Sequence, residues 1–181
     1  MSIVTKKGDL GETFLFSGEK ISKSDPRVEA YGTADELGAV LGLARSMIED
    51  KSLSDEVRNL QISLSSLCAE LATSNPDNSK WVIRKSTGDV EKMDLRIAEL
   101  ESEIKLPKSF CVAGACKSSA AIEVARTVAR RLERKVVALK TSGEKVNDEC
   151  LTYLNRISDY RFLLARKAEV LEKVPFDTVE K

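Results

Sequence analysis

The chain has 181 residues, which most simply make one domain with a core of its own. Its 29 lysines and arginines balance its 29 aspartates and glutamates, which argues against a nucleic-acid partner. The sequence lacks both a membrane-spanning apolar run and the apolar stretch of a signal peptide, so we expect a cytoplasmic protein without a membrane partner. Histidine is absent, which excludes His-based triads and the histidine-containing zinc and di-iron motifs, and we predict no metal site built by the protein.

The first 24 residues are rich in glycine and lysine and are predicted to form an irregular arm, with a short extended piece at 13–16. A long helix is predicted to follow, because Asp25 is a favourable N-cap and Pro26 suits the first helical position. Apolar residues continue at helical spacing to Ile48. A second helix is predicted from a cap at Ser54.

Three further helices are predicted in the second half of the chain. A strongly charged helix covers about 86–104, and a fourth helix begins after the segment VAGACKSS and ends at Gly143. The fifth covers about 146–173 and is stopped by Pro175. The predicted fold class is therefore all-α, a five-helix bundle of the ferritin-like kind. We expect a single domain over residues 1–181, with an arm at 1–24 and the bundle at 25–174.

The predicted fourth helix contains the segment ARTVARRLERK, in which Arg126, Arg130 and Arg134 lie four residues apart. They therefore stack along one helix face, where like charges repel by roughly 0.2–0.5 kcal/mol per pair. One interpretation is a solvated basic face that is salt-bridged to neighbouring helices. The other is a polyanion site, because arginine forks suit phosphate oxygens.

Two other helices carry polar side chains that suit a nucleotide site. In the segment YLNRISDY, Asn155 and Asp159 lie one turn apart, and Asn155 could contact an adenine or ribose edge or a neighbouring backbone group. In the segment YGTADEL, Asp35 and Glu36 could pair with an arginine of the fourth helix rather than act as a base.

The arm has the sequence TKKGDLGETFLFSGEK, with several glycines beside lysines. Glycines let backbone N–H groups approach a phosphate, and lysines neutralise its charge. The arm is not a Walker A loop, since GxxxxGK[ST] occurs nowhere in the chain. By itself the arm is equally compatible with a flexible terminus.

Taken together, these segments resemble the PduO-type ATP:corrinoid adenosyltransferases. The resemblance runs in order through TKKGDLGETFLFSGEKISKSDPRVEAYGTADEL, Phe110, ARTVARRLER and YLNRISDY, which cover about half of the chain. It implies that the protein transfers the 5′-deoxyadenosyl group of ATP to the Co(I) of a reduced corrinoid, giving adenosylcobalamin and triphosphate. It also implies a homotrimer with ATP at the subunit interfaces, with Mg²⁺, and with a reductase and an adenosylcobalamin-dependent enzyme as further partners.

The resemblance also assigns roles to individual residues of this sequence. Arg130, Arg126, Asp35 and Phe110 are the predicted catalytic residues: Asp35 would pair with Arg126 across the interface, and Phe110 would pack under the corrin ring. The nucleotide site would use residues of the arm and of the fourth and fifth helices, namely Thr5, Lys6, Lys7, Gly8, Thr13, Phe14, Lys23, Arg130, Arg131, Glu133, Arg134 and Asn155. The sequence departs from the family pattern in two places. The family's TKTGD is TKKGD in this chain, and the family's LPGG is VAGA, at residues 112–115.

Two other functions are compatible with these residues. A nucleotide-binding helical regulator would use the arm and the arginines, and Phe110 would be a plain core residue. A purely structural bundle would leave the charges solvated. The missing histidine fits corrinoid chemistry, because the chain offers the cobalt no imidazole ligand and a four-coordinate intermediate is easier to reduce.

Overall fold

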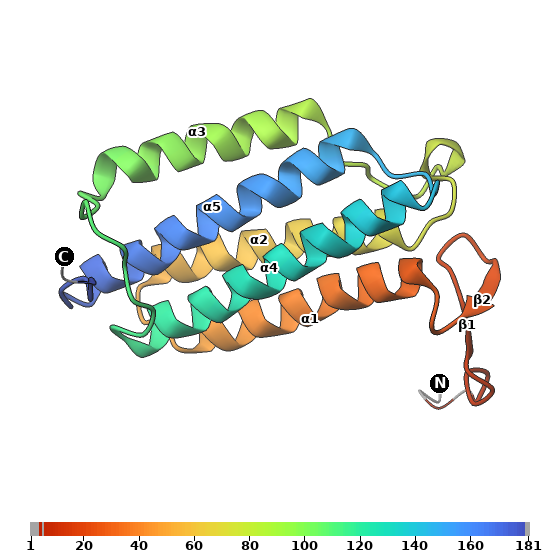
Figure 1. The fold of residues 1–181 in the computed structure, drawn as a ribbon, viewed down its shortest axis with the longest axis horizontal. Helices are drawn as coiled ribbons and strands as arrows, with labels where there is room; N and C mark the ends of the chain where they lie inside the picture. Colours follow the sequence, from red (N-terminus) through yellow and green to blue (C-terminus); the bar gives the residue numbers. More distant parts are fainter. Residues whose placement is uncertain (1–3, 5, 180–181) are drawn as a thin grey trace.

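In the part of the chain that the structure describes, Val4 and residues 6–179, five α-helices lie side by side as an elongated bundle (Figure 1). The coordinates are a computed structural model. The helices are α1 Pro26–Ser46, α2 Lys51–Leu71, α3 Thr87–Glu103, α4 Lys117–Thr141 and α5 Asp148–Leu171. Two short strands, β1 Glu12–Phe14 and β2 Lys20–Ser22, precede them, and a 3₁₀ helix, Pro76–Asn78, follows α2. The predicted all-α bundle is confirmed.

The helix starts follow the capping residues, with one correction. The Asp25 side chain accepts a hydrogen bond from the backbone of α1, as predicted. α3 begins close to its predicted start, and Ser86 forms a capping box there. The predicted start of α2 at Ser54 is wrong, because Asp50 is the N-cap and its carboxylate accepts from the Leu53 amide at 2.8 Å. A carboxylate also interacts favourably with the helix dipole, and the earlier start brings the buried Leu53 into the helix.

The bundle core lies where α1, α2, α4 and α5 face one another, and α3 packs on the outside of α5 (Figure 1). Leucines and alanines at helical spacing fill this core. Gln61 of α2 reaches across to donate a hydrogen bond to the Gly38 carbonyl of α1 at 2.9 Å. Gly42, one turn further along α1, leaves room for this side chain, because a Cβ there would stand 3.2 Å from Gln61 Nε2. No helix among the described residues is long and apolar enough to cross a membrane.

The N-terminal arm contains a hairpin that the sequence predicted only in part. β1 pairs with β2 in antiparallel register, with Thr13 opposite Ile21. The extended piece expected at 13–16 is thus a strand at 12–14, while its partner strand was not foreseen. The Phe16 amide donates to the Ala72 carbonyl at 2.8 Å, which anchors the hairpin at the end of α2. The arm therefore projects from the end of the bundle at which α1 begins (Figure 1).

Candidate functional site

The outward face of α4 lies between a flank that forms ion pairs with α1 and a flank that contacts α5. Arg131 pairs with Glu36 of α1 at 2.5 Å, and Lys135 pairs with Glu29 of α1 at 3.0 Å. These pairs direct one flank of α4 towards α1. The predicted nucleotide ligand Arg131 is therefore engaged with α1 and half-buried.

Arg130 and Arg134 are exposed between these flanks, and no ion pair is recorded for either of them within the described residues. Together with Glu133 and Val137 they line a surface hollow of about 320 Å³. Two guanidinium groups without an internal counter-ion are an electrostatic site for an anion supplied from outside the chain. Both arginines are solvated, as the alternative interpretation of the stripe expected, but the salt bridges of that interpretation are not found for them among the described residues.

Asn155 of α5, which the family resemblance assigns to the nucleotide site, lies beside this hollow. Its side-chain nitrogen donates to Glu133 Oε1 at 3.2 Å, and its oxygen accepts from Arg156 at 2.9 Å. Both groups are on the surface, so the contact closes the hollow on the α5 side without burying it. The structure therefore brings together four of the predicted residues, Arg130, Glu133, Arg134 and Asn155, from two helices.

Arg126 lies one turn before Arg130, in a different environment. Its Nε donates to Glu123 Oε2 at 2.5 Å, and both residues line a second hollow of about 320 Å³ that also includes Gly114. The predicted partner Asp35 is exposed on α1, and its carboxylate contributes to the raised pKa of the Cys68 thiol of α2, which burial mainly causes. Asp35 therefore lies on the α2 side of α1, and within one chain Arg126 pairs with Glu123 instead.

The arm residues are gathered around a tight turn. Lys23 lies across this turn: its backbone N–H donates to the Gly11 carbonyl at 2.8 Å, and a Cβ at Gly8 would stand 2.9 Å from Lys23 Nζ. Only glycine leaves that space free. Lys6 has a positive φ of 58°, and Lys6, Lys7 and Lys23 are all exposed.

The other predicted arm residues differ in their exposure, and one of them lies outside the part of the chain that the structure describes. Thr13 is half-buried in β1, and the neighbouring Phe14 is 52% exposed. Thr5 lies outside the described residues. An exposed aromatic ring among exposed lysines gives this arm a surface suited to contact with another molecule.

Phe110 lies in the connection between α3 and α4 and is 88% exposed. A segment near the C-terminus pairs with this connection: Val179 N–H donates to the Phe110 carbonyl at 3.0 Å, and Val112 N–H donates to the Asp177 carbonyl at 2.8 Å. Figure 1 shows this connection at the end of the bundle opposite the arm. A single chain therefore does not bring Phe110 and Lys23 together.

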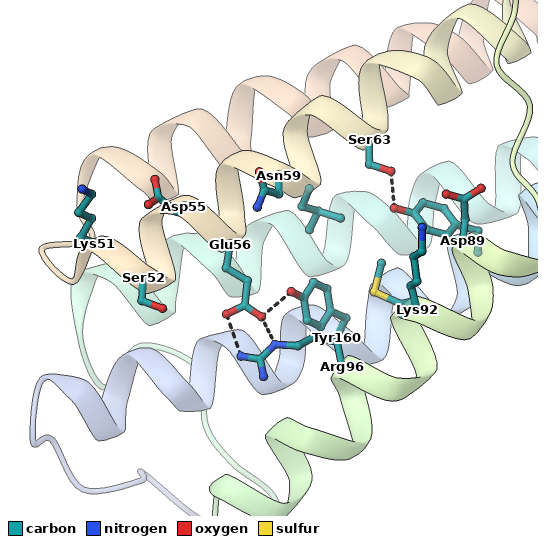
Figure 2. A pocket seen from close by; sticks show the side chains of 13 residues that line it. Lys51, Ser52, Asp55, Glu56, Asn59, Ser63, Asp89, Lys92, Arg96 and Tyr160 are labelled. Atoms are coloured by element: carbon teal, nitrogen blue, oxygen red, sulfur yellow. Dashed lines mark hydrogen bonds and ion pairs between the residues drawn. The ribbon is translucent and has the colours of Figure 1, made fainter.

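A groove of about 870 Å³ lies between α2, α3 and α5, and the sequence did not indicate it (Figure 2). Glu56 of α2 lies at its centre, 2.6 Å from Arg96 Nε of α3 and 2.6 Å from the Tyr160 hydroxyl of α5. Burial would raise the pKa of Glu56, but the hydrogen bonds from Arg96 and Tyr160 outweigh it and lower that pKa. None of the predicted site residues lines this groove.

A match to known proteins places the chain in a family. The family model described as cobalamin adenosyltransferase matches residues 3–168. The chain belongs to the cobalamin adenosyltransferase family. The match spans both the arm and the helices that carry the arginine stripe and Asn155, so the sequence resemblance is confirmed.

Relatives and solved structures agree with this assignment. The corrinoid adenosyltransferase PduO of Salmonella typhimurium is 36% identical over 92% of this chain, but the chain spans only 49% of that protein's length. A corrinoid adenosyltransferase of Citrobacter freundii is 37% identical over 95% of this chain and 97% of its own length. A variant of the PduO-type ATP:corrinoid adenosyltransferase of Lactobacillus reuteri, complexed with cobalamin and ATP, superposes with a TM-score of 0.90 at 32% identity. That match covers 99% of this chain and 100% of the Lactobacillus chain.

Proposed function

We propose that this protein transfers the 5′-deoxyadenosyl group of ATP to the Co(I) of a reduced corrinoid, giving adenosylcobalamin and triphosphate. The observation that carries the proposal is the hollow on α4, where Arg130 and Arg134 present unpaired guanidinium groups beside Asn155. Membership of the cobalamin adenosyltransferase family supports it, as do the relatives named as corrinoid adenosyltransferases.

The chemistry fits a site that is rich in cations and has no histidine. The Co(I) electron pair attacks C5′ of ATP, a Co–C bond forms, and the C5′–O bond breaks with its electrons leaving on triphosphate. No proton is removed from the nucleophile, so the protein needs no general base. Its work is to align the reactants and to stabilise the leaving group, for which Lys6, Lys23, Arg126 and Arg130 supply positive charge.

Mg²⁺ would be bound mainly through ATP. The described residues contain no group of three or more carboxylates and thiols that could enclose a metal ion. Mg²⁺ commonly binds through substrate phosphates with one or two protein oxygens, so this donor set fits delivery of the ion on the triphosphate. The ion would then add to the charge that the arginines and lysines neutralise.

The arrangement of the site favours an assembly of subunits with ATP between them, and we propose a homotrimer. Phe110 and the lysine-bearing arm lie at opposite ends of one bundle, so a complete site needs the arm of a second copy (Figure 1). In that assembly Asp35 of a second subunit would approach Arg126. The exposed Phe14 of the arm would be covered by the same contact.

Phe110 would form the corrinoid side of the site. Its exposed ring has no packing role within the described chain, and a phenylalanine below the corrin ring would exclude water and the corrinoid's own lower base. The four-coordinate Co(II) form that results is easier to reduce. We further propose a cytoplasmic location, a reductase that supplies the electron, and an adenosylcobalamin-dependent enzyme that receives the product.

The direct test mixes the protein with ATP, Mg²⁺ and chemically reduced cobalamin. We expect the light-sensitive spectrum of adenosylcobalamin to appear. Arg130→Ala should abolish ATP binding or turnover and leave the helical circular dichroism intact, because its side chain is exposed. Arg58→Ala, which removes an exposed arginine from α2, is the matched control. Binding of ATP without any adenosylcobalamin would instead indicate a nucleotide-binding regulator.

A further inference from the structure

Four charged side chains of alternating sign run from the outer face of α4 into the bundle. Arg126 Nε donates to Glu123 Oε2 at 2.5 Å, and Glu123 Oε1 lies 3.5 Å from an Nη2 atom of Arg166 in α5. The same Arg166 atom is 2.8 Å from Glu169 Oε1. The exposed fraction of the side chain falls along the series. It is 30% at Arg126 and 7% at Glu123, then 1% at Arg166 and 0% at Glu169.

This series distinguishes Arg126 from the other arginines of the stripe. Arg130 and Arg134 have no ion pair within the described residues, so their long side chains are free to change rotamer. Arg126 is held at Nε, and no hydrogen bond is recorded within the described residues for its two terminal nitrogens. Those two nitrogens form a fork that is free to bind an anion presented from outside the chain.

We infer that Glu123 is a positioning residue for the adenosyl transfer: it fixes the direction in which Arg126 presents its terminal nitrogens, and Arg166 and Glu169 hold Glu123 in place. This inference rests on the proposed function, because the anion that Arg126 meets is either the triphosphate or Asp35 of a second subunit. A guanidinium that is already aimed loses less rotational freedom when it binds than a free side chain does.

The electrostatic balance of the series explains why Glu123 itself is held firmly. The four groups carry two positive and two negative charges, and the total is zero only while Glu123 is ionised: Arg166 and Glu169 balance each other, and Glu123 balances Arg126 while adding a second carboxylate beside Arg166. Without Glu123, the buried Arg166 retains Glu169 alone and Arg126 loses its anchor. Loss of this carboxylate therefore has two separable effects, one on stability through Arg166 and one on turnover through Arg126.

The first test is Glu123→Gln, which keeps the side-chain shape and removes the charge. We expect kcat/KM for adenosyl transfer to fall about 10- to 100-fold, the range for losing a charge-assisted hydrogen bond. Glu99→Gln is the matched control, because it removes a carboxylate that pairs with Arg96 three residues away on α3, far from the stripe. An unchanged kcat/KM in Glu123→Gln would overturn the inference.

The second test separates positioning from a general loss of stability. Arg126→Lys keeps the positive charge but has no Nε to bind Glu123, and its position is half-buried, so the variant is expected to fold. If Glu123 acts through Arg126, Glu123→Gln in the Arg126→Lys background lowers Tm but gives no further loss of kcat/KM. Equal, additive losses of kcat/KM in both backgrounds would contradict the positioning role.

A third measurement is independent of activity. The ¹⁵N-labelled Nε–H of Arg126 should give a cross-peak protected from solvent exchange in the wild type, and Glu123→Ala, which removes the acceptor, should abolish that protection. The same cross-peak in both proteins would overturn the inference even if both were active. A wild type that shows the protected Nε–H but makes no adenosylcobalamin would contradict the proposed function and leave the geometry of Arg126 established.

Discussion

The side-chain nitrogen of Asn155 lies 3.2 Å from Glu133 Oε1, and this contact keeps the Glu133 carboxylate on the α5 side of the arginine hollow. Glu133 is three residues from Arg130, a spacing at which opposite charges pair on a helix surface. Asn155 therefore holds the carboxylate that would otherwise compete with an incoming anion for Arg130.

The first prediction follows from that competition. In Asn155→Ala, Glu133 becomes free to pair with Arg130, and we expect ATP to bind about 2- to 10-fold more weakly. Isothermal titration calorimetry with ATP measures the change. The double variant Asn155→Ala/Glu133→Gln should recover the lost affinity. Failure to recover would mean that Asn155 contacts the nucleotide itself rather than acting through Glu133.

The second prediction concerns the exposed ring of Phe110. Phe110→Ala should leave the free energy of unfolding within about 0.5 kcal/mol of the wild type, because the ring is 88% exposed. ATP binding should be unchanged, while adenosylation starting from Co(II) corrinoid and a reductant should be poor. Trp81→Ala removes an equally exposed aromatic ring between α2 and α3 and serves as the control. Near-normal turnover of Phe110→Ala would refute the proposed role.

The third prediction concerns Arg161, which is completely buried on the core face of α5. None of its three guanidinium nitrogens has a hydrogen-bond partner among the residues that the structure describes. A buried charge without a partner is destabilising, and an apolar side chain of similar length removes that cost. We expect Arg161→Met to raise the free energy of unfolding by about 1–4 kcal/mol, measured by urea denaturation. A less stable variant would show that Arg161 has a partner in solution.

The fourth prediction is the pH dependence of that gain. Burial lowers the pKa of Arg161 from its ordinary value to about 9. Between these values the unfolded chain binds a proton that the folded chain does not, so stability of the wild type rises with pH there. The advantage of Arg161→Met should therefore be full below pH 9 and smaller by about 1–2 kcal/mol near pH 10.5. Urea denaturation of both proteins at the two pH values tests this, and a constant difference would contradict it.

The fifth prediction concerns the pairing of residues 110–112 with the segment that ends at Val179. Val179→Pro removes the N–H that donates to the Phe110 carbonyl, and we expect the amide of Val112, which donates to Asp177 in the same pairing, to exchange faster with deuterium. Hydrogen exchange followed by mass spectrometry over residues 108–116 measures this, with α3 as the internal reference. Unchanged protection of Val112 would mean that the pairing does not order this segment.

Most of the fold could be predicted from local patterns in the sequence. Asp25 caps its helix as predicted, because an N-cap acts only on the turn that follows it. Ser54 was wrongly predicted to be a cap, since an equally good cap at Asp50 lies one turn earlier and brings Leu53 into the helix. The strand partner of β1 could not be predicted, because three-residue strands have too short a pattern to show alternation.

The residues of α4 and α5 that line or border the hollow could be predicted from the sequence. The ion pairs that hold the neighbouring side chains were not predicted. Arg130 and Arg134 share a face by helical periodicity alone, and the family resemblance added Asn155. The pairing of Arg126 with Glu123 was missed, although the i,i+3 spacing is visible in the sequence. The burial of Arg166 and Glu169 could not be foreseen, because it depends on which face of α5 meets α4.

The Glu123–Arg166 contact also sets the alignment of two helices. α4 and α5 run in opposite directions, and Glu133 meets Asn155 about 15 Å further along α4 from the place where Glu123 meets Arg166. Sliding α5 by one helical turn would separate both contacts at once and leave Arg166 buried without Glu123. The longitudinal register of α4 against α5, and with it the position of Asn155 beside Arg130 and Arg134, thus depends on a buried ion pair that lies outside their hollow.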